Sequence, residues 1–190
     1  AGNSWIQTPG LDRLAAEGTR FSQCVTPVPV CMAARHSFMT GQRCAAHGRY
    51  ANNVPEPDPL HYTLMQLLGF AGYRTQAIGK MHFTPIDELH GFDDRVFAEG
   101  KMFSDYDAYR ESLREQGLDE QYFEHVKRWA NEENFGADTF PLGDENYVDT
   151  FIGKNGAKML AENEQYPFFA WLSFCNPHMP FDPPEPFDTM

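Results

Sequence analysis

Cys31 and Arg35 are the two residues of this chain whose types and spacing most directly suggest chemistry. Side chains four residues apart share one face of a helix, so a helix here would bring the thiol and the guanidinium together. Pro27 and Pro29 cannot lie inside a helix, and we therefore expect it to begin at or near Cys31. A sulfur at the positive end of a helix, beside a fixed cation, predicts a site for an anionic substrate.

Lys80, His82 and His178 are further basic residues that the sequence places at strand ends. Residues 73–78 have the pattern of a strand, which would deliver Gly79-Lys80-Met81-His82 to the carboxyl edge of a sheet. The apolar run 168–174 indicates a central strand covered on both faces, and it ends just before Asn176-Pro177-His178. Open α/β sheets bind their ligands at this edge, so we expect these side chains to gather around position 31.

The first half of the chain alternates between helix and strand signals. Thr8 and Pro9 predict a helix start, and the inward stripe up to Gly18 consists of Leu11, Leu14 and Ala15. Residues 19–25 predict a short strand, and the Asn- and Pro-rich stretch 51–59 predicts an irregular loop. Thr63 opens a second helix that Gly72 closes, with an inward stripe of Leu64, Leu67 and Leu68.

The second half contains an acidic, aromatic segment, 91–142, with helical patches around 106–114 and 122–130 and no catalytic signal. We interpret this segment as a helical insertion that shapes or covers the pocket. Residues 147–161 predict an amphipathic helix weakened by two glycines. The whole pattern predicts an α/β fold, a largely parallel central sheet flanked by helices, with residues 1–190 forming part of one domain.

Composition excludes several classes of protein. The 190 residues carry a formal charge of −12, which argues against a nucleic-acid surface, and no apolar run approaches a membrane span. Four cysteines in a chain of this length are no disulfide framework. Cys24 and Cys175 lie in apolar runs, so we expect both to be buried thiols.

Four blocks, taken together and in this order, resemble the sulfatases of the alkaline-phosphatase superfamily. The resemblance spans nearly the whole chain. Cys31-Met32-Ala33-Ala34-Arg35 followed by Thr40-Gly41 matches the Cys-x-Ala-x-Arg form of the sulfatase motif. The other three blocks are Thr8 to Phe21, Ala71 to His82 with its Gly-Lys-x-His end, and Pro167 to Phe181 with its Pro-His-x-Pro end.

The resemblance implies hydrolysis of a small sulfate monoester by a sulfuric ester hydrolase. Cys31 would be oxidised to formylglycine by a maturase; its hydrated aldehyde would attack sulfur, and it would also be a ligand of a divalent cation, Ca²⁺ or Mg²⁺. Arg35 would stabilise the diol, and Lys80 would bind the sulfate and the bridging oxygen. His82 would bind the diol and help remove a proton when the intermediate collapses, and His178 would contact the sulfate and protonate the leaving alcohol.

The chain departs from the family pattern in two ways. The acidic pairs expected before the first helix and far downstream are absent, so we expect an internal piece of a longer enzyme, inactive by itself. Ala33 stands where proline is usual. No leader is visible, and the expected location is the cytoplasm or the periplasm of a bacterium.

Two other functions stay open. A phosphonate monoester or phosphodiester hydrolase of the same superfamily would use the same cavity, and a catalytically silent relative would only bind anions or partners. Taken alone, Cys31 and Arg35 would be more simply a buried thiol and a surface arginine. Zinc binding by His47 with Cys31 is disfavoured by the spacing, and His36 is assigned a structural role. No role is predicted for His61, His90, His125 or the acidic pairs 93–94 and 132–133.

Overall fold

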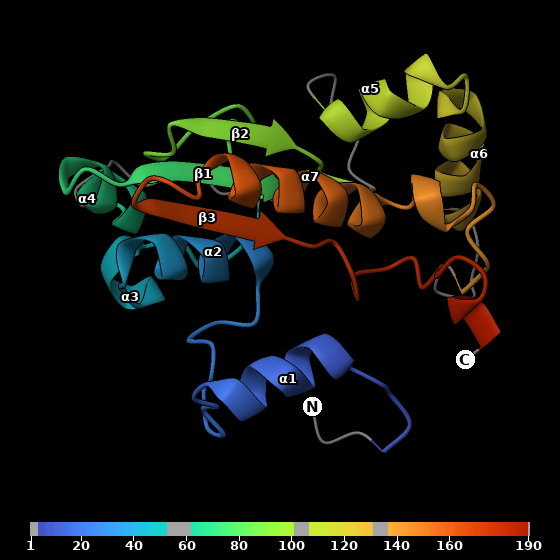
Figure 1. The fold of residues 1–190 in the computed structure, drawn as a ribbon. Helices are drawn as coiled ribbons and strands as arrows, with labels where there is room; N and C mark the ends of the chain where they lie inside the picture. The colour runs from blue at the N-terminus through green and yellow to red at the C-terminus, as the bar shows by residue number, and fades with distance from the viewer. Residues whose placement is uncertain (1–3, 53–61, 101–106, 131–136, 190) are drawn as a thin grey trace.

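The computed structural model describes residues 4–52, 62–100, 107–130 and 137–189. At its centre lies a parallel sheet of β1 (Arg74–Gly79), β2 (Asp94–Phe97) and β3 (Phe168–Ser173), in the order β2-β1-β3 (Figure 1). The register places Gly79 between Phe97 and Ser173, so the carboxyl ends of the three strands lie side by side. The predicted fold class, a parallel sheet flanked by helices, is confirmed.

Helices cover both faces of β1. Ile78 faces α7 (Val148–Glu162), and Ala77 faces α2 (Cys31–Thr40) and α4 (Leu64–Phe70) on the opposite side (Figure 1). Successive strand residues point to opposite faces, which explains how one strand serves two cores. The buried partners of Ile78 include Val148, Ile152 and Met159, and those of Ala77 include Met39, Met65 and Met81.

The helix α7 confirms the prediction made for residues 147–161, and one of its glycines has a packing role. A Cβ at Gly156 would overlap the side chain of Leu172 on β3. The glycine therefore lets the helix approach the sheet closely, and its low helix propensity is offset by this contact.

The helix α4 begins and ends as predicted. Thr63 and Gln66 form a reciprocal capping box at its start. At its end Gly72 has a φ of +85°, the amide of Tyr73 donates to the carbonyl of Leu68, and that of Gly72 donates to the carbonyl of Gly69. The inward stripe was wrong in part, because Leu67 is 52% exposed and Met65 is the fully buried residue. The loop predicted over 51–59 lies largely outside the described residues.

The segment 91–142 contributes both helices and a strand. The predicted helical patches correspond to α5 (Ala108–Glu115) and α6 (Asp119–Ala130). The strand β2, which pairs with β1, was not predicted, so the segment is part of the central sheet as well as a covering layer. The remaining elements are the short helices α3 (Cys44–His47), η1 (Asp144–Asn146) and η2 (Phe187–Thr189).

The N-terminal region differs most from prediction. The helix α1 (Pro9–Glu17) begins as expected, but none of its residues is buried, and Leu11 and Leu14 are more than 60% exposed. It lies apart from the sheet in Figure 1, so its apolar stripe has no core to face. The predicted strand 19–25 is irregular chain, and no strand of the described residues pairs with it. Cys24 is consequently exposed rather than buried.

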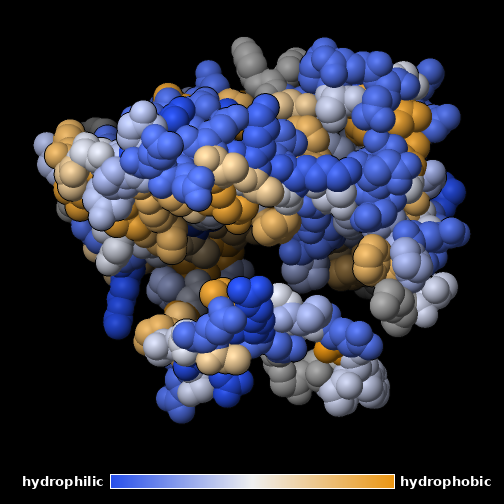
Figure 2. Space-filling model, viewed as in Figure 1, coloured by the Kyte–Doolittle hydropathy of each residue, from blue (hydrophilic) through white to orange (hydrophobic). Residues whose placement is uncertain are grey.

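β3 was predicted as a central strand covered on both faces, and this was also wrong. Among the described strands β1 is central, and β3 lies at an edge with most of its residues only half-buried. Figure 2 shows hydrophobic surface over the part of the molecule that contains the sheet. Cys175, just beyond the strand, is buried as predicted. No helix among the described residues is long and apolar enough to cross a membrane.

Candidate active site at the carboxyl edge of the sheet

Cys31 is the first residue of α2, as the prolines before it predicted. Its side chain is half-buried. No side chain of the N-cap residue closes this helix start. Instead the amide of Met32 donates to Oδ1 of Asn52 at 3.1 Å. The thiol therefore lies at the positive end of the helix, where a negative group is favoured.

Arg35 connects α2 to the carboxyl ends of two strands. Its Nη1 donates to the carbonyl of Lys80 at 2.6 Å and to Oγ of Ser173 at 3.1 Å. Its guanidinium also lies 5.8 Å from the ring centre of Trp171. Burial lowers the pKa of Arg35, and the negative charges of Glu99 and of a Cys31 thiolate oppose that change. The predicted pairing of Cys31 and Arg35 on one helix face is therefore present in the structure.

A sharp turn after β1 carries Lys80 and His82. Gly79 begins it with a φ of +96°, and a Cβ there would overlap the carbonyl of Ser173. The amide of Lys80 donates to that carbonyl at 3.0 Å. His82 has a φ of +53°, a left-handed conformation that is costly for a residue with a side chain. The turn therefore needs glycine at one position and external support at another.

Lys80 is 6% exposed. Within the described part of the chain, no carboxylate forms an ion pair with its ammonium group. A buried charge without an opposite charge is costly, and such a group is a common mark of a binding site for the missing charge. The residue thus fits the sequence prediction of an anion site.

His82 is held neutral by its surroundings. Burial and then the positive charges of Lys80, Arg35, His178 and Arg49 lower its pKa from 6.5 to about 4. Its Nδ1 is buried and has no hydrogen-bond partner among the described residues. The same cations that lower this pKa show that His82 lies within electrostatic reach of Lys80, Arg35 and His178. An unpaired ring nitrogen among cations is suited to an anionic or hydroxyl ligand.

His178 follows β3 and is exposed. Its Nδ1 lies 2.7 Å from the carbonyl oxygen of Met179. A carbonyl oxygen only accepts, so Nδ1 carries the hydrogen in this contact. The structure thus brings Arg35, Lys80, His82 and His178 to one edge of the sheet; their individual chemical roles stay predictions.

The sequence did not reveal three contributors to this site. Glu99, beyond β2, accepts hydrogen bonds from the amides of Met81 and His82. Arg49 is 2% exposed and adds to the positive charge at His82. Ser173 was inside a quoted motif but had no role assigned. The sequence signal for Glu99 is a carboxylate two residues after a strand. This signal can be read only when β2 has been recognised as a strand.

The site residues do not form a divalent-cation site by themselves. Among the described residues no group of three or more His, Cys, Asp and Glu side chains is arranged to hold a metal ion. Arg35 and Lys80 are cations, which repel a metal, and the carboxylate of Glu99 is engaged with the amides of Met81 and His82.

The other histidines have structural partners. His47 shares a 2.8 Å hydrogen bond with Oγ of Ser37 and accepts one from the amide of Arg49 at 3.2 Å, which leaves no zinc site with Cys31. His36 lies against its ring. His125 is paired with Asp182. The pair 93–94 is exposed, whereas His61 and the pair 132–133 lie outside the described residues.

The fold is of the alkaline-phosphatase-like type. The structure of the phosphonate monoester hydrolase of Agrobacterium radiobacter superposes with a TM-score of 0.76 at 21% identity, covering 98% of this chain and 39% of that one. The profile of the Sulfatase family matches residues 1–190, and the chain belongs to that family.

Named relatives agree with this assignment. An arylsulfatase of Clostridium perfringens is 30% identical over 97% of this chain and 41% of its own length. A choline-sulfatase of Rhizobium meliloti is 39% identical over 48% of this chain and 18% of its own length. The chain thus spans about two fifths of the arylsulfatase and less than a fifth of the choline-sulfatase.

Proposed function

We propose that the protein to which this chain belongs hydrolyses a small sulfate monoester at the carboxyl edge of the sheet. The observation that carries the proposal is the buried residue Lys80, whose ammonium forms no ion pair with a carboxylate of the described residues, beside the neutral ring of His82. Together with Arg35 they offer positive charge and an open ring nitrogen in one place. A sulfate group would supply the missing negative charge.

Cys31 would supply the nucleophile after its conversion to formylglycine by a maturase. In that form its hydrated aldehyde offers a hydroxyl in place of the thiol, at the helix start where negative charge is stabilised. The buried Nδ1 of His82 is the unpaired polar atom that fits a hydroxyl at this place. A divalent cation, Ca²⁺ or Mg²⁺, bound in part by position 31, belongs to the same proposal for the whole protein.

The residues of this chain would divide the remaining tasks. Lys80 would bind the sulfate oxygens, and Arg35 would hold the site together through Lys80 and Ser173 while facing position 31. Bound sulfate adds negative charge beside His82, which raises the pKa of its ring and makes it a better proton acceptor. His178, in its protonated imidazolium form, would contact the sulfate and give a proton to the leaving alcohol, and would itself become neutral.

A phosphonate monoester or phosphodiester hydrolase is the second candidate, since a structural neighbour is a phosphonate monoester hydrolase. Tetrahedral phosphorus fits the same cationic edge. The test is a comparison of kcat/KM for 4-nitrophenyl sulfate, bis(4-nitrophenyl) phosphate and a 4-nitrophenyl phosphonate monoester, using the full-length enzyme. We expect the sulfate to be preferred, and a preference for the phosphonate would overturn the choice.

A further inference from the structure

Glu99 is a buried carboxylate that contacts the backbone of the turn after β1, which carries Lys80 and His82. It lies two residues beyond β2, whose last residue, Phe97, pairs with Gly79. The parallel register therefore places Glu99 beside the residues that follow β1. Its side chain is fully buried.

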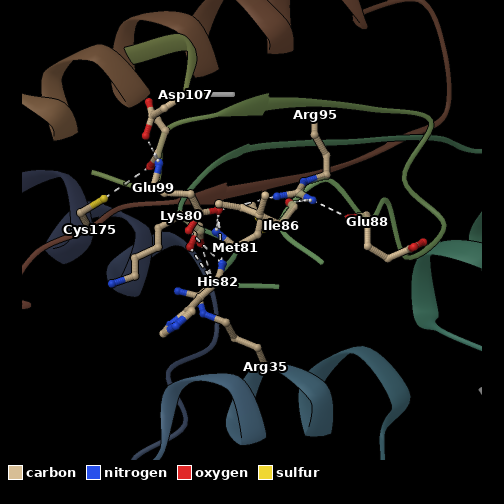
Figure 3. A network of polar contacts seen from close by, with 12 residues as sticks. Arg35, Lys80, Met81, His82, Ile86, Glu88, Arg95, Glu99, Asp107 and Cys175 are labelled. Carbon is tan, nitrogen blue, oxygen red and sulfur yellow. Dashed lines mark hydrogen bonds and ion pairs between the residues drawn. The ribbon is translucent and has the colours of Figure 1, made fainter. Parts of the chain in front are cut away.

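The carboxylate of Glu99 accepts hydrogen bonds from two successive backbone amides. The amide of Met81 donates to Oε1 at 2.9 Å, and the amide of His82 donates to Oε2 at 3.0 Å and to Oε1 at 3.3 Å. In Figure 3 the side chain of Lys80 and that of His82 extend away from this carboxylate, toward the side from which Arg35 reaches the turn. Glu99 thus holds the backbone of the turn and leaves both side chains free.

Other residues fix Glu99 itself. Arg95 lies with Nη2 3.7 Å from Oε1, and its guanidinium is stacked between Phe83 and Phe97. Arg95 also donates to the carbonyls of Ile86 and Glu88 (Figure 3). The backbone of Glu99 donates to Asp107, the N-cap of α5, at 2.9 Å.

The strained backbone of His82 explains why such support is needed. A side-chain-bearing residue at positive φ costs on the order of 1–2 kcal/mol and persists only where surrounding contacts fix it. Charge-assisted hydrogen bonds to backbone amides are among the stronger contacts available for this purpose.

We propose that Glu99 is a positioning residue, whose carboxylate holds Met81 and His82 so that the Lys80 and His82 side chains face the substrate. The inference rests on the proposed function for its kinetic consequence, and on the structure alone for its geometric one. Glu99 touches no reacting atom; it acts through the turn. Because a misplacement of about 1 Å can cost roughly 100-fold in rate, its removal is expected to have a large kinetic effect.

The test compares Glu99→Ala and Glu99→Gln in the full-length enzyme. Glutamine keeps an oxygen that can accept from both amides, so it should restore kcat/KM to within about tenfold of the wild type, whereas alanine should lower it about 100-fold, mostly through kcat. The matched control is Asp93→Ala. Asp93 also binds a backbone amide, that of Thr75 at 2.8 Å, but at the opposite end of β1.

Hydrogen exchange gives a second measurement that needs no substrate. In Glu99→Ala the amides of Met81 and His82 should exchange at least about tenfold faster, and in Glu99→Gln and Asp93→Ala they should not. If Glu99→Ala fails to fold because Arg95 is left unpaired, the double variant Arg95→Met/Glu99→Ala removes both buried charges and takes its place.

The outcomes separate the two proposals. Unchanged exchange at both amides, equal kinetic losses in Glu99→Ala and Asp93→Ala, or wild-type kcat/KM in folded Glu99→Ala would each overturn the positioning role. A wild-type enzyme that hydrolyses no sulfate ester would overturn the proposed function. In that case faster exchange confined to the two amides in Glu99→Ala would still support the role of Glu99.

Discussion

The carboxyl edge of the sheet and the helical layer of α5, α6 and α7 differ in the partners of their buried polar side chains. In the helical layer three buried side chains have matching partners: His125 lies 2.8 Å from Asp182, and Tyr109 and Tyr122 donate to backbone carbonyls. At the sheet edge His82 lies among cations, and its Nδ1 has no hydrogen-bond partner among the described residues.

The difference separates a histidine with a structural partner from the histidine for which we propose a catalytic role. An imidazole beside a carboxylate stabilises the fold, because each partner satisfies the other. An imidazole beside Lys80 and Arg35 destabilises it unless a further, negative group completes the site. Both histidines are mostly shielded from water, so burial alone does not distinguish them.

The variant with the largest expected effect is Lys80→Ala in the full-length enzyme, which tests whether the sheet edge binds an anion. If Lys80 binds the sulfate, kcat/KM for 4-nitrophenyl sulfate should fall by about 100-fold to 1,000-fold, as when an electrostatic stabiliser is removed. Thermal unfolding should change little, because no ion pair of the described residues is lost. Lys158→Ala, an exposed lysine, is the control. Unchanged kcat/KM in Lys80→Ala would remove the residue from the site.

His178→Ala tests the role of a leaving-group acid, and we expect a loss of about 10-fold to 100-fold in kcat. The loss should be greater for an alkyl sulfate than for 4-nitrophenyl sulfate, because the poorer leaving group needs the proton more. Stability should be unaffected, since the side chain is exposed. The same loss for both substrates would speak against the acid role.

His125→Asn tests the structural side of the comparison. It removes the 2.8 Å contact between His125 and the buried Asp182, so the free energy of unfolding should fall by about 1–3 kcal/mol. The kcat of the folded enzyme should stay within about twofold of the wild type, since His125 touches no site residue. Urea unfolding and steady-state kinetics measure the two quantities. A large loss of kcat at unchanged stability would reverse the assignment.

His82→Asn should also change the pH dependence of stability. Burial and neighbouring cations lower the pKa of His82 to about 4, so between pH 6.5 and 4 the unfolded chain binds a proton that the folded chain does not. Its contribution to stability is therefore complete above pH 6.5 and is lost as the pH falls toward 4. As the pH falls from 6.5 to 4, we therefore expect His82→Asn to lose less stability than the wild type.

Urea unfolding at several pH values checks that expectation. His90, whose pKa burial also lowers to about 4, is present in both proteins and cancels in their difference. Curves of equal slope for the wild type and His82→Asn would contradict the electrostatic description of the site.

Much of the fold could be predicted from local signals. The capping residues Thr63 and Gly72, the prolines before Cys31 and the apolar pattern of α7 are each set by neighbouring residues. The failures concern contacts with distant chain. The apolar stripe of α1 predicted burial, but burial needs a surface to face, and the strand 19–25 needed an edge to pair with. β2 is four residues long and lies among polar residues, so its pattern was too short to detect.

The candidate site was more predictable than the core. The motif spacing and the strand ends placed Cys31, Arg35, Lys80, His82 and His178 at one edge, because parallel strands bring their carboxyl ends together. The supporting residue Glu99 could not be predicted, since its role depends on the register between β1 and β2. Arg49 lies beyond a helix of only four residues, and nothing in its local sequence indicated burial beside His82.

The most direct test is mass spectrometry of the peptide that contains Cys31, taken from full-length protein produced in its native host. If this edge of the sheet is a sulfate-ester site with a cysteine-derived nucleophile, a substantial fraction of residue 31 should be the aldehyde. A thiol that remains wholly unconverted in such material would contradict the account and favour a protein that binds anions without hydrolysing them.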